Sequence, residues 1–398
     1  MKKQITLLLF LLIHLSAWNQ KSITNNGSCT DAMAHNAKGR WIKTGDLADL
    51  SSINAKEAYS RLNEIHDMML KIYPQPTGVD AVWHRSGGLN YFGAKQKYFD
   101  PKDGPTNSIS LPHFVQYSYA SKFFDYRCYE GKMIPGYPGE TGAVMTVVAN
   151  RFDHFTGDGI DCDMNLGGLP VKMRNVLKGK WKGYDLYGPQ AGSSGSTVLI
   201  HRPGMLPYIP VTRKQYLDHS IKHLTAMYDK IIKGFEQMPV RSPEEQEKEK
   251  NSKLEKFKKD FGSDPKKLKS TVDYYLAGYQ TEQQRRDEQV NESKKYKKDI
   301  VKRYQDELEK TTNEGLLDSP ACVVVIHSPD LTTPIFVAED KGHMLVTDNP
   351  DYIRKDLPKY IPQFFVLNWR GMSSGVRGEV GKVINEKFPI EKLQAMIR

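Results

Sequence analysis

The sequence QFFVLNWRGMSSG occupies residues 363–375 of the 398-residue chain and combines three structural signals. Its first part, Gln363 to Trp369, is an almost continuous apolar run that predicts a β-strand. The glycines and serines that follow predict a turn. Beyond the turn, apolar residues at helical spacing predict a helix: Val376, Val380, Ile384 and Phe388. The C-terminal portion, residues 319–398, is therefore predicted to combine strands with helices.

The turn also matches the G-x-S-x-G pattern of serine hydrolases, through Gly371, Ser373 and Gly375. In those enzymes the turn lifts the nucleophilic serine above the sheet, and the acid and the histidine follow it in the chain. No histidine follows His343 in this sequence. We therefore interpret Ser373 or Ser374 as the N-cap of a helix and not as a nucleophile.

The C-terminal portion either completes the sheet of the region before it or forms a small second domain. Its other predicted strands cover 321–327, 334–338 and 343–347. The sequence VVIHSP at 324–329 echoes VLIHRP at 198–203, which fits either two hairpins of one style or an internal duplication. Two similar hairpins are the favoured explanation, and the echo favours completion of one sheet.

Residues 29–240 are rich in glycine, proline and aromatic residues and predict a mixed sheet with flanking helices. A helix is predicted over 55–72, and Thr212 with Gln215 forms a capping box that begins another. Strands are predicted at 113–129, 143–149, 197–200 and 208–211.

The segment 83–137 holds 13 aromatic residues in 55. Aromatic side chains exposed on a sheet stack on sugar rings or on other aromatic groups, whereas buried ones build a core. The sequence leaves both interpretations open and favours the core.

Residues 241–314 are 36 charged residues in 74, with a net charge of only +2. The sequence SPEE at 242–245 predicts a helix start, and GSDP at 262–265 predicts a break followed by a second start. Apolar stripes flank the stretch 280–289, which has none of its own. We predict a long charged helical hairpin that acts as a spacer or clamp, with a partner-binding coiled coil as the alternative.

These regions together predict an α+β fold. It consists of an aromatic-rich mixed-sheet domain at 29–240, a charged helical hairpin at 241–314 and a β-α portion at 319–398.

Residues 1–20 predict a secretory signal peptide, because Lys2 and Lys3 precede an apolar run over 5–15. That run is too short to cross a bilayer, and no later segment approaches 18 apolar residues. We therefore expect the mature chain to be periplasmic or secreted, without a transmembrane segment.

The net charge of +10 falls to +8 when the signal peptide leaves with its two lysines. The excess is spread thinly, without the concentrated basic face or the recognisable module of a nucleic-acid-binding protein. The charge therefore excludes nucleic acid as the expected partner and favours weak attraction to anionic glycans or an envelope surface.

Four cysteines in an exported chain predict at least one disulfide. Cys322 lies in an apolar run and is interpreted as a buried thiol, and Cys29 is placed in a frayed N-terminal segment. The predicted disulfide therefore joins Cys128 to Cys162.

A calcium site is a further hypothesis for the acidic loop that contains Asp158, Asp161, Asp163 and Asn165. The last three place oxygen-bearing side chains at alternate positions, which suits a hard cation. The loop lacks the glycine and the bidentate glutamate of an EF-hand. An acidic turn whose side chains cap backbone amides is therefore the favoured interpretation.

His219 and His223 share one helix face, but they lack the adjacent glutamate of zinc peptidases and are interpreted as ordinary helix residues. The sequence favours an exported non-catalytic binding or envelope-associated protein, whose partner is an anionic glycan, an envelope surface or a protein. The alternative is a secreted hydrolase that draws on His201, His327 and the loop 153–163. A histidine beside a carboxylate in a cleft would favour the hydrolase, and a flat aromatic patch would favour binding.

Overall fold

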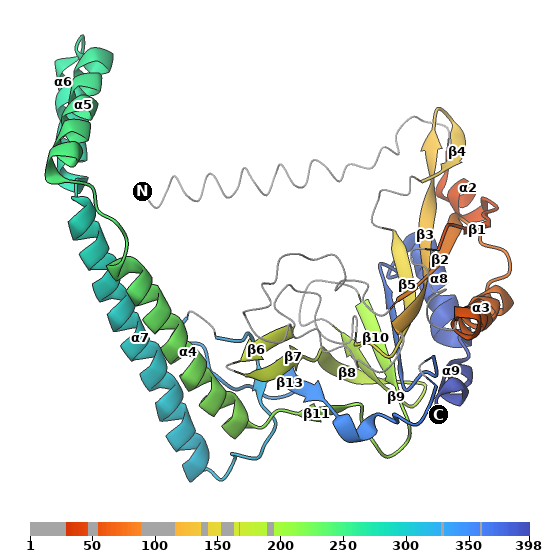
Figure 1. Ribbon diagram of the computed structural model, residues 1–398. Coiled ribbons are helices and arrows are strands. Elements are labelled where there is room, and N and C mark those ends of the chain that lie inside the picture. Colours follow the sequence, from red (N-terminus) through yellow and green to blue (C-terminus); the bar gives the residue numbers. More distant parts are fainter. Residues whose placement is uncertain are drawn as a thin grey trace.

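The chain adopts an α+β fold in which a body built of β-sheets carries a long helical arm (Figure 1). The computed structural model describes residues 29–46, 55–88, 116–136, 142–152, 163–166, 168–188, 195–327, 330–358 and 360–398.

The larger sheet has nine strands in the order β1-β2-β3-β5-β14-β10-β9-β8, with β4 paired to β3. Their bounds are β1 Trp41–Lys43, β2 Val79–Gly88, β3 Gln116–Tyr129, β4 Lys132–Pro135, β5 Ala143–Ala149, β8 Val176–Trp181, β9 Tyr184–Gly188, β10 Gly195–Ile200 and β14 Phe365–Arg370. Strand β1 runs parallel to β2, and the other pairs are antiparallel. On β14, Val366 lies opposite Val148 of β5 on one side and Leu199 of β10 on the other. The C-terminal portion thus supplies a central strand of this sheet.

The smaller sheet has five strands, in the order β11-β13-β7-β6, with β12 also paired to β13. Their bounds are β6 Asp163–Leu166, β7 Leu169–Met173, β11 Tyr208–Pro210, β12 Cys322–Val323 and β13 His343–Asp348. All of the pairs are antiparallel. A short 3-10 helix, Pro350–Tyr352, follows β13.

The body is layered, because successive residues of one strand point to opposite cores. On β14, Leu367 lies in the core beneath α3 (Ala55–Ile72), α8 (Gly375–Lys387) and α9 (Ile390–Met396), and Val366 lies in the core between the two sheets. On β13, Val346 joins that second core, and Leu345 joins a third core against the arm. The order of layers is therefore helices, large sheet, small sheet and arm. Burial on both faces explains why residues 363–369 are almost uniformly apolar.

The arm consists of two pairs of helices. Helix α4 (Arg213–Glu236) packs along α7 (Glu282–Asn313), and the hairpin of α5 (Pro243–Phe261) and α6 (Pro265–Gly278) extends the arm away from the body (Figure 1). The apolar contacts between α4 and α7 include Tyr228 with Tyr296, whose ring centroids lie 5.4 Å apart. Ion pairs such as Glu236 to Lys294 at 3.0 Å add to them. The sequence did not predict that α7 packs on α4 along this length.

The predicted helix starts are confirmed. Thr212 and Ser242 each form a capping box, with Gln215 and Glu245 respectively, and the predicted break falls between α5 and α6. Ser374 occupies the N-cap position of α8, although its side chain donates and accepts no capping hydrogen bond.

Two strand predictions for the C-terminal portion are wrong: one strand is much shorter than predicted, and the other does not form. The strand predicted at 321–327 is limited to Cys322–Val323, and 334–338 forms no strand. The chain leaves the sheet after Val323: Val325 is 48% exposed, and His327 has the left-handed backbone angle φ of +53°. The echo with 198–203 therefore corresponds to two different local structures.

The predicted disulfide between Cys128 and Cys162 is wrong, because Cys128 is bonded to Cys29. The two Cα atoms lie 5.8 Å apart. Cys29 is not frayed: helix α2 (Asp31–Asn36) follows it, and the Gly39 N–H donates to the Pro76 carbonyl at 2.9 Å. Cys162 lies outside the described residues. Cys322 is a buried free thiol, as predicted.

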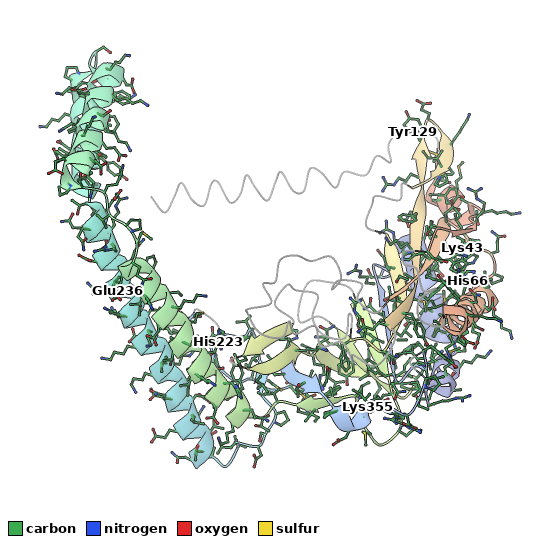
Figure 2. The ribbon with its side chains drawn as sticks, in the orientation of Figure 1. Lys43, His66, Tyr129, His223, Glu236 and Lys355 are labelled. Atoms are coloured by element: carbon green, nitrogen blue, oxygen red, sulfur yellow. A yellow bond between two sulfur atoms is a disulfide. The ribbon has the colours of Figure 1, made fainter. Side chains whose placement is uncertain are left out.

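Where the structure describes the aromatic segment 83–137, most of its side chains belong to the body's cores. Tyr117, Tyr119 and Phe123 of β3 are at most 2% exposed, whereas Tyr129, near the disulfide, is 57% exposed (Figure 2). The core interpretation is therefore confirmed for Tyr117, Tyr119 and Phe123, and not for Tyr129. Among the helices that the structure describes, none has the length and apolar character needed to cross a membrane.

Candidate functional site

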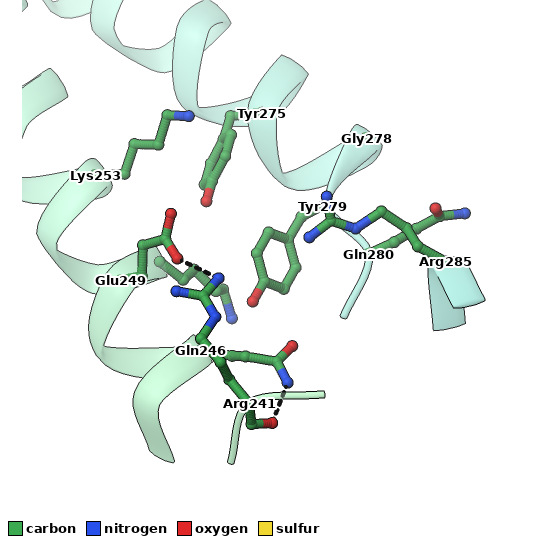
Figure 3. A pocket seen from close by; sticks show the side chains of 10 residues that line it. Arg241, Gln246, Glu249, Lys253, Tyr275, Gly278, Tyr279, Gln280 and Arg285 are labelled. Atoms are coloured by element: carbon green, nitrogen blue, oxygen red, sulfur yellow. Dashed lines mark hydrogen bonds and ion pairs between the residues drawn. The ribbon is translucent and has the colours of Figure 1, made fainter. Parts of the chain in front are cut away.

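A pocket of about 210 Å³ lies at the joint of the arm, where the α4–α7 pair meets the α5–α6 hairpin (Figure 3). Its wall combines four basic side chains, one glutamate, two tyrosines and two amides. The lining residues are Arg241, Gln246, Glu249, Lys250, Lys253, Tyr275, Gly278, Tyr279, Gln280 and Arg285.

The pocket forms because three helix ends meet within a few residues. Helix α5 begins at the capping box of Ser242, and α6 ends where the Tyr279 N–H donates to the Leu276 carbonyl. Helix α7 begins at a further capping box, formed by Thr281 and Gln284. Each box satisfies backbone N–H groups that a helix start leaves unpaired. The local sequence therefore fixes the backbone around the pocket.

One network ties the start of α5 to the start of α7. Arg241 Nε donates to Glu282 Oε1 at 2.7 Å, and another of its nitrogens lies 2.7 Å from Glu249 Oε2. Gln246 donates to the Arg241 carbonyl at 2.7 Å and accepts from the Glu282 N–H at 2.8 Å. The hydrogen bonds from Arg241 hold the pKa of Glu282 below its usual value. The network thus ties the two helix starts together and places two carboxylates on one guanidinium.

The opposite wall places lysines against tyrosine rings. Lys250 Nζ lies 5.2 Å from the ring centre of Tyr279, and Lys253 Nζ lies 5.5 Å from that of Tyr275. The two rings are 5.7 Å apart, and Phe257 packs edgewise on Tyr275. Burial is the main cause that raises the pKa of Tyr275 above its usual value, so its phenol stays neutral at physiological pH. The wall is therefore both apolar and positively charged.

Lys253 and Arg285 differ from the other basic residues of the pocket. Arg241 and Lys250 form ion pairs, the latter with Glu247 at 3.2 Å. Lys253 and Arg285 are exposed, and within the described part of the chain neither side chain is paired with a carboxylate. They come from α5 and α7 and lie on opposite sides of the two tyrosine rings in Figure 3. The pocket thus offers two cationic side chains without an ion-pair partner among the described residues, although the charge of Arg285 acts on the nearby Glu282 carboxylate.

A second candidate cluster surrounds His327, where the arm joins the body. The His327 ring is stacked on Tyr216 and on His223, with ring centroids 6.3 and 5.4 Å away. Tyr304 packs on it edgewise, and the Tyr216 and Tyr304 hydroxyls are 3.3 Å apart. Burial, with a smaller effect of the His223 charge, lowers the pKa of His327 to about 4. His327 is therefore a neutral ring enclosed in an aromatic cluster.

The predicted hydrolase residues do not meet in the described part of the chain. His327 has no carboxylate contact there, and its Nε2 has no hydrogen-bond partner among these residues. His201 lies elsewhere in the body, and its Nδ1 is 2.8 Å from the Arg202 carbonyl. Most of the third element, the loop 153–163, lies outside the described residues. In the described residues, His201 and His327 thus do not come together.

The proposed calcium ligands are described only in part. Asp158 and Asp161 lie outside the described residues, and Asp163 and Asn165 lie two residues apart on β6, which pairs with β7. Among the described residues, no group of three or more histidine, cysteine, aspartate or glutamate side chains could hold a metal ion. The calcium hypothesis stays a prediction.

A third histidine, His66 of α3, belongs to the body and is 8% exposed (Figure 2). Its ring is stacked on Trp83 with centroids 3.7 Å apart, and its Nδ1 lies 3.2 Å from the Tyr119 hydroxyl. Burial is the main cause that lowers the pKa of His66 to about 4. These contacts make it part of the body's packing.

The sequence did not identify the pocket at the joint. Tyr275 and Tyr279 were visible as part of an apolar stripe, which more often marks packing than a binding site. A more specific signal was the pair Lys250 and Lys253. They lie on the predicted helix just before the one that carries the tyrosines, and the short break between the two helices predicts that they pack side by side.

No protein-family model matches the chain, and no curated protein or solved structure is significantly similar to it.

Proposed function

We propose that this protein is an exported, non-catalytic binding protein whose helical arm carries its ligand site at the joint pocket. The observation that carries the proposal is the pocket's wall, in which two tyrosines and four basic side chains surround about 210 Å³ on an element that extends away from the body. Stacking surfaces and basic groups suit an envelope component such as an anionic glycan.

Export is supported by two features at the N-terminal end. The apolar run behind Lys2 and Lys3 has the composition of a signal peptide. The disulfide between Cys29 and Cys128 is of a kind that persists in oxidising compartments. An exported chain meets envelope glycans and surfaces, which agrees with the chemistry of the pocket.

The test is a glycan-array screen with the full mature chain. We expect a bound glycan whose signal falls strongly when Tyr275 and Tyr279 are both replaced by alanine. Tyr274→Ala is the matched control, because this neighbouring side chain is 85% exposed and does not line the pocket. Equal loss in the control and in the double variant would contradict a role for the pocket.

The alternative, a secreted hydrolase, gives a different result in the same preparation. It predicts turnover of ester, amide or glycoside substrates that is lost in His327→Ala and unchanged when both tyrosines are replaced. Such turnover without glycan binding would overturn the proposed function.

A further inference from the structure

The strongest unexplained feature of the pocket is a pair of cations, Lys253 and Arg285, that form no ion pair within the described residues. Lys253 and Arg285 come from two helices that are fixed to one another by the Arg241 network, so their separation is set by the fold. Neither is paired with a carboxylate of the described chain, although acidic residues are frequent in this region. The other two basic side chains of the wall are already paired, and the one acidic residue of the lining, Glu249, is held by Arg241.

The size and the wall of the pocket argue for more than a bare ion. A volume of about 210 Å³ holds several water molecules and exceeds the needs of one small anion. The half-buried rings of Tyr275 and Tyr279 lie between the two cations and offer an apolar surface. Aromatic rings pack against the C–H face of a sugar ring. A sugar bound in this way would direct its charged substituents away from the tyrosine rings, toward the edge of the pocket.

We propose that the joint pocket binds a saccharide that carries sulfate or phosphate groups. The ring lies against Tyr275 and Tyr279, and the anionic groups meet Lys253 and Arg285. This inference rests on the proposed function and adds the chemical class of the ligand. Charge-assisted hydrogen bonds from a lysine and an arginine to such oxygens are shorter and stronger than those between neutral groups.

Gly278 gives a way to block the site without changing its charge. A Cβ atom at this position would meet no atom within 4 Å, so a side chain placed there projects into open space at the pocket wall. Gly234 of α4 has the same open surroundings but does not line the pocket. Gly278→Leu and Gly234→Leu therefore form a matched pair.

The experiment is calorimetric titration of the full mature chain with four probes. These are inorganic sulfate, inorganic phosphate, a sulfated heparin-derived oligosaccharide and the same oligosaccharide after desulfation. We expect the sulfated oligosaccharide to bind at least about tenfold more tightly than either free ion, and the desulfated form to bind weakly. Binding of a free ion as tight as that of the oligosaccharide would identify an ion site and overturn the saccharide assignment.

The double variant Lys253→Gln, Arg285→Gln should weaken binding of the sulfated oligosaccharide by about tenfold or more. Its control, Lys256→Gln with Lys298→Gln, removes the same net charge from exposed positions outside the pocket. Gly278→Leu should also abolish binding, and Gly234→Leu should not. Equal losses in the two double variants would mean attraction by net charge alone and would overturn the inference.

Failure of this inference is distinguishable from failure of the proposed function. A neutral glycan that binds and is lost only when Tyr275 and Tyr279 are replaced leaves the binding function intact and excludes the anionic ligand. If the protein binds no glycan at all, both the proposed function and the assignment of an anionic saccharide are contradicted. Circular dichroism of each variant shows whether the arm remains helical.

Discussion

The body and the arm of this protein are stabilised by different interactions. In the body, strands β10, β13 and β14 are buried on both faces, and side chains such as Phe365 and Leu367 are fully buried. In the hairpin at the end of the arm, α6 has no buried residue and α5 buries only Gln246. Apolar burial therefore dominates the body, whereas capping boxes, ion pairs and cation–aromatic contacts hold the outer arm.

Because of this difference, substitutions in the body and in the arm should cost very different free energies. Apolar burial contributes about 25 cal/mol per Å², so loss of one core side chain costs several kcal/mol. Exposed ion pairs contribute about 0–1 kcal/mol each. The outer arm is consequently the less stable part of the molecule, and the body is the more stable one.

The largest expected effect is in the body. Phe365→Ala removes a fully buried ring from the central strand β14 and should lower the free energy of unfolding by about 3–5 kcal/mol. Phe257→Ala, in the arm, should cost less than about 1.5 kcal/mol, because this ring is only half-buried against Tyr275. Chemical denaturation measures both: tryptophan fluorescence follows the body, and far-UV circular dichroism follows the helical arm, which has no tryptophan. Equal costs would show that the arm is packed as firmly as the body.

The next effect is a loss of stability in acid. Burial lowers the pKa of His66 and of His327 from 6.5 to about 4. Between these two pH values both histidines are protonated in the unfolded state and neutral in the folded state. The stabilising effect of keeping each ring neutral is complete above pH 6.5 and is lost as the pH falls toward 4. The full shift corresponds to about 3 kcal/mol for each histidine, an upper value.

Two variants separate the body from the arm in this pH dependence. His66→Phe keeps a ring on Trp83, and His327→Asn suits the left-handed backbone at that position. Each should reduce the fall in stability between pH 6.5 and 4.5, the first in body unfolding and the second in hydrogen exchange of α4 and α7. An unchanged slope in both variants would assign the acid sensitivity to other groups.

The smallest effect is in the outer hairpin of the arm. Ser242→Ala breaks the capping box that begins α5, which should cost about 1 kcal/mol and accelerate tryptic cleavage in 243–278. Ser263→Ala is the matched control, since the neighbouring Asp264, and not Ser263, caps α6. Limited proteolysis with mass spectrometry locates the first cut. A first cut within α7, or equal rates for the two variants, would contradict the view that α5 and α6 open first.

Local signals predicted much of this fold, because caps, breaks and apolar periods depend on neighbouring residues. Thr212, Ser242 and the 55–72 helix are examples, and together with the strand at 143–149 they indicated the α+β class. The apolar run at 324–326 led to a wrong strand prediction. The chain leaves the sheet after Val323, and Val325 is exposed. Apolar composition alone does not show whether a strand finds a partner.

Pairing between distant residues was not predictable in the same way. Cys128 had three possible partners, and the choice of Cys29 depends on α2 packing beside β3, which no local pattern announces. The pocket has the same character, since Lys253, Tyr275 and Arg285 approach one another only when three helix ends meet. The sequence showed that such residues were present and did not show their proximity.

The central position of β14 has a consequence for the order in which the chain can fold. Strands β5 and β10 are complete by residue 200, but the strand that joins them spans 365–370, near the end of the chain. Until those residues emerge, both strands expose an unpaired edge that can pair with other chains. The arm helices are made of local contacts and can form during this interval. Closure of the large sheet is therefore a late step, and a chain truncated before residue 365 should aggregate rather than yield a smaller stable body.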